Sequence, residues 1–165
     1  MKNTTLIYRS PKEIDSLIHA FQEGSLPRSQ WTHEAHLTVA LWYLCYDSEQ
    51  EAINAIRNGI KLYNSVQGIE TTQNSGYHET VTLFWVRNVG RYLADESHNR
   101  SIVHLANGLI AQYADRTLPF RYYTRDRLIS WEAKNSWVEP DLKPLESETA
   151  RDFNPSRNEA ISTKY

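Results

Sequence analysis

Two short motifs carry the residues of this sequence that are best suited to chemistry. W-T-H-E-A-H-L covers residues 31–37 and G-Y-H-E-T covers residues 76–80. Neutral imidazole is the commonest metal ligand in proteins, and three imidazoles with one open position form a typical catalytic site. The motifs therefore predict a divalent transition metal ion (zinc, iron or manganese) bound by His33, His36 and His78.

Each motif also contains a glutamate directly after a histidine, Glu34 in the first and Glu79 in the second. In a metal site these residues would act as general base toward a metal-activated water, or as a carboxylate ligand of a non-haem iron. A structural alternative stays open. Carboxylates in the first turn of a helix are favoured by the helix dipole, and buried histidines stabilise a fold when their nitrogens find hydrogen-bond partners.

A third motif, R-Y-Y-T-R-D-R at residues 121–127, combines three arginines with two tyrosines. Guanidinium groups bind carboxylates and phosphates through paired N–H donors. We therefore expect Arg121, Tyr123 and Arg125 to contact a small anionic ligand. The alternative is that acidic side chains such as Asp115 pair with these arginines at the surface.

Helical periodicity places the histidine motifs at the starts of helices. Apolar residues recur at three- and four-residue spacing over six stretches, which are approximately residues 11–23, 32–46, 48–67, 77–94, 99–113 and 124–133. His33, His36 and His78 fall on the apolar stripes of the second and fourth stretches, so all three are expected to face inward. They would meet if these two helices packed with their starting ends together.

The absence of strand alternation predicts an all-α fold, a single-domain helical bundle of five or six helices over residues 1–145. Residues 137–145, W-V-E-P-D-L-K-P-L, contain two prolines that disfavour a helix or a central strand. We expect this segment to form an extended strap that lays its apolar side chains on the bundle, namely Trp137, Val138, Leu142 and Leu145. Residues 146–165 are expected to form a flexible tail.

Composition restricts the partners. The chain has 165 residues, a formal net charge of -2 and a pI near 6.3, which argues against a basic surface for nucleic acid. No stretch approaches the ~20 apolar residues of a membrane helix. Cys45 is the only cysteine and the first residues lack the apolar core of a signal peptide, so a cytoplasmic location is expected.

Taken together, the motifs resemble those of a family of small bacterial proteins. The resemblance extends from about Phe21 to Leu145 and includes L-P-F-R-Y-Y-T-R-D-R-L besides the motifs above. It implies no activity, but it implies that six residues belong to the family pattern: His33, His36, His78, Arg121, Tyr123 and Arg125. The histidines also show a looser similarity to metal-binding four-helix bundles of the DinB/YfiT type. Here, unlike in that type, the close histidine pair has i, i+3 spacing and precedes the single histidine.

The sequence therefore favours a metal-binding helical bundle and makes it a candidate for a metal-dependent enzyme that acts on a small anionic molecule. The rival hypothesis is a non-catalytic module that binds a small molecule or a protein partner and uses its histidines structurally. A third alternative is a homodimer formed through aromatic faces, since five tryptophans and ten tyrosines are many for this length.

Overall fold

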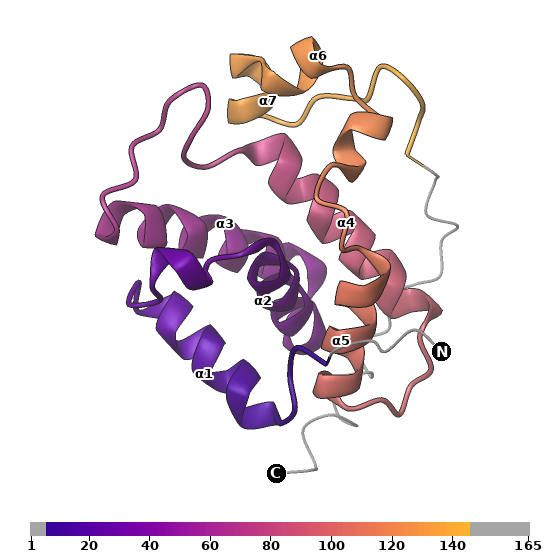
Figure 1. Ribbon diagram of the computed structural model, residues 1–165. Helices are drawn as coiled ribbons and strands as arrows, with labels where there is room; N and C mark the ends of the chain where they lie inside the picture. Colours follow the sequence, from indigo (N-terminus) through magenta and orange to yellow (C-terminus); the bar gives the residue numbers. More distant parts are fainter. Residues whose placement is uncertain (1–5, 146–165) are drawn as a thin grey trace.

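A computed structural model describes residues 6–145, and within them the protein is all-α, as predicted (Figure 1). No β-sheet occurs in this part of the chain. The seven α-helices of the described residues are α1 (Pro11–Gln22), α2 (His33–Tyr46), α3 (Glu49–Val66), α4 (Glu79–Asp95), α5 (Ile102–Gln112), α6 (Arg125–Ile129) and α7 (Trp131–Asn135). Two short 3-10 turns cover Arg28–Gln30 and Leu118–Arg121. The predicted flexible tail, residues 146–165, lies outside the described residues.

Local side-chain chemistry defines where these helices begin. Ser10 and Glu13 form a capping box at α1, and Ser48 and Glu51 form one at α3. The Thr32 hydroxyl accepts a hydrogen bond of 3.3 Å from a backbone N–H of the first turn of α2. Each contact satisfies backbone donors that a helix start leaves without partners. These three starts agree with the sequence to within about a residue.

The predicted sixth helix is divided into α6 and α7. Ser130 adopts an extended backbone, with φ -61° and ψ 151°, and ends α6. Its hydroxyl then accepts a hydrogen bond of 3.1 Å from the Ala133 N–H and caps α7. The periodicity of apolar residues continues across the break, which is why the sequence predicted a single helix.

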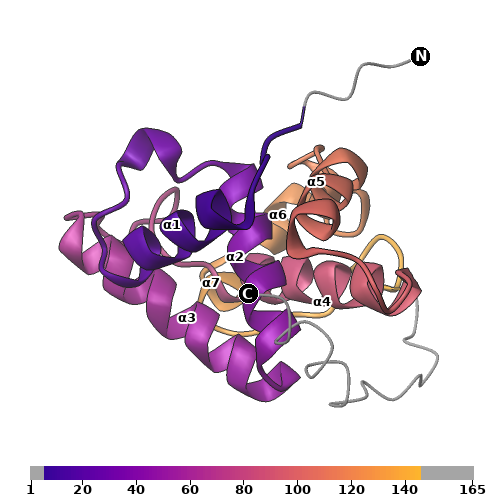
Figure 2. The same cartoon turned by 90° about the horizontal axis from the view of Figure 1, so that it is seen from below.

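Helix α2 lies at the centre of the bundle and contacts α1, α3, α4 and α5 (Figures 1 and 2). Nine of its fourteen residues are buried, and Leu37, Val39 and Leu41 each expose 1% or less of their surface. A helix that is apolar on all sides must be enclosed by others. This position explains why the apolar run of α2 is not confined to a single stripe.

A second, smaller core holds α6, α7 and the strap against α4. Its buried residues are Phe84, Tyr123, Leu128, Ala133 and Val138. The Thr80 hydroxyl donates to the Ser136 carbonyl (2.8 Å) and accepts from the Val138 N–H (3.2 Å). Val138 thus packs as the strap prediction requires. Leu142 does not, because 54% of its surface is exposed and only its backbone N–H is bound, to the Tyr122 carbonyl.

The buried amide of Asn107 in α5 fastens the segment that precedes α1. Its Oδ1 accepts from the N–H groups of Ile7 (2.9 Å) and Tyr8 (3.0 Å). Its Nδ2 donates to the carbonyls of Tyr8 (2.8 Å) and Val103 (2.9 Å). One side chain therefore reproduces the pairing that a neighbouring strand would offer, and all four hydrogen-bonding positions of the amide are used.

No helix within residues 6–145 has the length and apolar character needed to cross a membrane. The cytoplasmic location, the absence of a nucleic-acid partner and the homodimer stay predictions.

Candidate functional site

His33 is the first residue of α2 and is half-buried between α4 and α5. Its Nε2 donates to the Tyr113 carbonyl at 2.8 Å, because a carbonyl can only accept. The ring meets Trp85 edge to face, with a centroid distance of 4.7 Å. In the tautomer with the proton on Nε2, the ring lone pair is on Nδ1.

His36 lies one turn further along α2, but it is exposed rather than inward-facing as the stripe predicted. Its Nδ1 donates to the Thr32 carbonyl at 2.7 Å, and its ring centroid lies 3.7 Å from that of Trp31. The protein atoms packed around the ring lower the pKa of His36 to about 4, even though one part of the residue reaches solvent. At neutral pH the ring is therefore uncharged, with its lone pair on Nε2.

His78 caps α4 instead of lying on its apolar stripe. Its Nδ1 accepts from the Val81 N–H (3.3 Å), so Nε2 carries the proton and donates to the Leu128 carbonyl (2.8 Å). Burial lowers the pKa of His78 below its ordinary value. Both ring nitrogens thus have partners within the protein, and the side chain joins the start of α4 to α6.

These three histidines make hydrogen bonds to three different segments: the end of α5, the turn before α2, and α6. Within residues 6–145, no group of three or more His, Cys, Asp or Glu side chains is arranged to hold a metal ion. Binding of zinc, iron or manganese by His33, His36 and His78 stays a prediction. The role of Glu34 as a general base also stays a prediction. Hydrogen bonds with its own backbone N–H and with the Thr32 side chain lower the pKa of Glu34.

Glu79 lies at the centre of a partly buried polar cluster at the start of α4. Arg57 of α3 binds it through two contacts, Nε to Oε2 at 3.1 Å and Nη2 to Oε1 at 2.6 Å. The Tyr77 hydroxyl donates to Oε2 at 2.6 Å. Burial acts to raise the pKa of Glu79, but these donors outweigh it and the pKa is lowered. The carboxylate is therefore ionised at neutral pH and neutralises Arg57.

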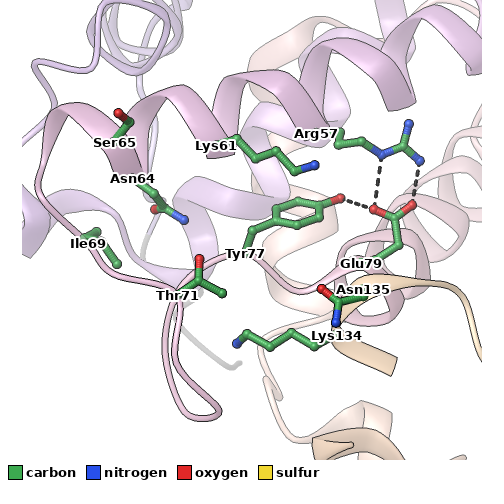
Figure 3. Close-up of a pocket in the computed structure, with 10 residues that line it drawn as sticks. All are labelled: Arg57, Lys61, Asn64, Ser65, Ile69, Thr71, Tyr77, Glu79, Lys134 and Asn135. Carbon is green, nitrogen blue, oxygen red and sulfur yellow. Dashed lines mark hydrogen bonds and ion pairs between the residues drawn. The ribbon is translucent and has the colours of Figure 1, made fainter. Parts of the chain in front are cut away.

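This cluster forms one wall of a pocket of about 460 Å³ between α3, the 68–76 loop, the start of α4 and α7 (Figure 3). The lining residues are Arg57, Lys61, Asn64, Ser65, Ile69, Thr71, Tyr77, Glu79, Lys134 and Asn135. The volume is within the range of small-molecule sites, ~300–1,000 Å³. Tyr77 and Glu79 connect this pocket to the G-Y-H-E-T motif.

Two lysines give the pocket its charge. Lys61 projects from α3 with its ammonium 4.9 Å from the centroid of the Tyr77 ring. Lys134 of α7 exposes only 4% of its surface, and burial lowers its pKa. In the part of the chain that the structure describes, neither lysine forms an ion pair with a carboxylate.

No family model, curated protein or solved structure matches this chain. The family resemblance inferred from the motifs therefore stays a prediction. The role of the pocket has to follow from its own residues, their charges and their burial.

None of the three residues expected to bind an anion lines this pocket. Arg121 pairs with Asp115 at the exposed surface, at 3.2 Å. Tyr123 is fully buried and its hydroxyl donates to the Val138 carbonyl, at 2.9 Å. Arg125 is exposed at the first position of α6. Ligand binding by Arg121, Tyr123 and Arg125 stays a prediction.

The sequence motifs did not indicate Arg57, Lys61 or Lys134 as site residues. The sequence did contain a signal for Arg57 and Lys61: residues four positions apart in a helix lie on the same face, so these two cations are neighbours. Lys134 carried no such signal. It lies more than 70 positions from Lys61 in the sequence, and only the packing of α7 on α4 brings it to the pocket.

Proposed function

We propose that this protein binds a small anionic molecule in the pocket between α3, α4 and α7. The observation that carries the proposal is Lys134, a buried cation that lines the cavity and has no carboxylate partner among the described residues. Removing an ammonium group from water is costly unless a counter-charge is near. An anionic ligand would supply that charge.

The balance of charges in the pocket supports the same proposal. Three cationic side chains and a single carboxylate line it, which leaves a surplus of two positive charges. Because Arg57 and Glu79 neutralise each other, the surplus belongs to Lys61 and Lys134. The overall chain carries -2, so this positive region is a local feature and not a consequence of composition.

The hydrogen bonds of Glu79 favour binding over catalysis at this site. A general base works best when its pKa lies near the operating pH. Glu79 has a lowered pKa and both of its oxygens accept hydrogen bonds, so it is a weak base. We therefore propose a non-catalytic binding module, in which Glu79 positions Arg57 and Tyr77.

Replacing Lys134 with methionine is expected to weaken binding of inorganic phosphate by about 10- to 100-fold. This fold-change corresponds to the loss of one hydrogen bond to a charged group. Lys134→Arg keeps the charge and should retain most of the affinity. Isothermal titration calorimetry at constant ionic strength measures both. Lys143→Met is the matched control, because Lys143 lies over Tyr122 and outside the pocket. Equal affinity of Lys134→Met and the wild type would contradict the proposal.

Metal binding at the start of α2 is a second candidate function. His33 and His36 each donate one ring N–H to a backbone carbonyl, which leaves the other nitrogen able to bind a metal. Outer hydrogen bonds of this kind commonly orient metal-binding histidines. We expect elemental analysis of untagged protein to find stoichiometric metal that is lost in a His33→Ala/His36→Ala variant. A His19→Ala/His104→Ala variant is the control, since both residues are exposed. Metal-free wild type would exclude this candidate.

A further inference from the structure

We propose that the ligand of this pocket is a phosphorylated sugar or polyol, a small molecule with one phosphate group and several hydroxyls. The proposal rests on the anion-binding function above and specifies its chemical class. It follows from three features of the pocket: the type of cation that is free to bind, the placement of the two lysines, and the polarity of the remaining wall.

The free cations are ammonium groups, which suit phosphate. A carboxylate is best recognised by the planar fork of an arginine, through two parallel hydrogen bonds. Arg57 is the only arginine among the residues that line the pocket. Its two parallel hydrogen bonds are already made to the carboxylate of Glu79. Lysine instead acts as a compact charge with three donors, which matches the tetrahedral oxygens of a phosphate. The available donors therefore favour a phosphate group over a carboxylate.

The two lysines approach the pocket from opposite walls, Lys61 from α3 and Lys134 from α7 (Figure 3). A phosphate monoester carries close to two negative charges at neutral pH. Its charge matches the surplus of two positive charges that Lys61 and Lys134 give the pocket. Lys134 is the more buried of the two lysines, so its ammonium group gains most from the negative charge of the phosphate.

The rest of the wall is polar and suits hydroxyl groups. Asn64, Ser65 and Thr71 line it, and none of their side chains has a hydrogen-bond partner among the described residues. Among the lining residues, the apolar or aromatic side chains are those of Ile69 and Tyr77. Binding of an apolar ligand would leave these donors and acceptors without partners, which is unfavourable. A ligand with several hydroxyls would satisfy them.

A tight loop keeps Thr71 at this wall. Gly76 has φ +85°, a conformation that favours glycine, and a Cβ atom there would lie 2.7 Å from the Cα of Thr71. Thr72 and Ser75 close the same loop through a backbone hydrogen bond of 3.1 Å and a hydroxyl contact of 2.9 Å. The hydroxyl-binding side of the pocket is thus organised before a ligand arrives.

Calorimetric titration of the full chain with four probes tests the chemical class. The probes are glucose 6-phosphate, inorganic phosphate, glucose and succinate. We expect glucose 6-phosphate to bind at least about tenfold more tightly than inorganic phosphate, because sugar hydroxyls add hydrogen bonds. Glucose and succinate should bind more weakly than inorganic phosphate. Glycerol 3-phosphate, titrated in parallel, separates the contribution of a sugar ring from that of a short polyol.

An Asn64→Ala variant identifies the wall that recognises the hydroxyls. It should lower the affinity for glucose 6-phosphate by about 3- to 10-fold and leave that for inorganic phosphate unchanged. Asn58→Ala is the matched control, an exposed asparagine on the same helix that does not line the pocket. Equal binding of all phosphates, or tighter binding of succinate, would overturn the chemical class while the anion pocket stands. Failure of every anion to bind would overturn the anion-binding function itself.

Discussion

Replacing Phe84 with alanine is expected to lower the free energy of unfolding by about 3–5 kcal/mol. Phe84 has no exposed surface and stands at the centre of the second core, where its ring packs against Trp85, Tyr122 and Tyr123. The neighbouring rings come from two segments, α4 and the residues just before α6, so they cannot move together to fill the cavity. Since domains of this kind are stable by only about 5–15 kcal/mol, the loss is large.

Urea denaturation followed by circular dichroism measures this change. Phe120→Ala is the matched control, because 42% of Phe120 is exposed, and it should change stability by less than about 1 kcal/mol. Phe84→Ala should also weaken phosphate binding, since the second core holds α7, which carries Lys134. A Phe84→Ala protein as stable as Phe120→Ala would show that α6, α7 and the strap are not packed on α4 as described.

Removal of the Glu79 carboxylate is expected to have the second largest effect. Glu79→Ala should lower the free energy of unfolding by about 2–4 kcal/mol. This is at or below the range for fully buried ion pairs, because 29% of the Arg57 side chain is exposed. Arg57 and Tyr77 would each lose a partner. A double-mutant cycle with Arg57→Ala should give a coupling energy of about 1–3 kcal/mol. Additive effects of the two substitutions would contradict a direct interaction.

The pH dependence of Glu79→Gln provides an independent check. The pKa of Glu79 is lowered in the folded protein, so its ionised form is favoured there. The stabilisation is therefore complete above the unfolded pKa, about 4.3, and is lost as the pH falls through the lower folded value. Melting temperatures of wild type and Glu79→Gln should differ by a constant amount from pH 8 to about pH 5.5 and converge at lower pH. A difference that grows on acidification would contradict this assignment.

The helices were predictable where local chemistry decides them. Capping boxes such as Ser48 with Glu51 involve residues three apart, and periodicity reports which face is buried. The same local rules failed at Ser130, where the hydroxyl caps a new helix within a continuous apolar pattern. They also failed at Leu142, whose apolar character says nothing about whether a neighbour is present to cover it.

The candidate site was less predictable, because its geometry depends on contacts between distant segments. Periodicity placed His36 and His78 on inward faces, but the first is exposed and the second caps α4. At the start of a helix, the periodicity of apolar residues does not determine which way a side chain points, because no helical turn precedes it. Glu79 was singled out as a base, yet its partner Arg57 lies 22 positions earlier and changes its chemistry.

The amide of Asn107 has a consequence for the order in which the protein assembles. It joins segments that are 99 and 100 positions apart, so its contact closes a far longer loop than those between adjacent helices. During synthesis, residues 7 and 8 emerge long before α5 does. Their backbone groups stay bound to water until that helix is in place. The earliest described residues of the chain are therefore among the last to reach their native positions.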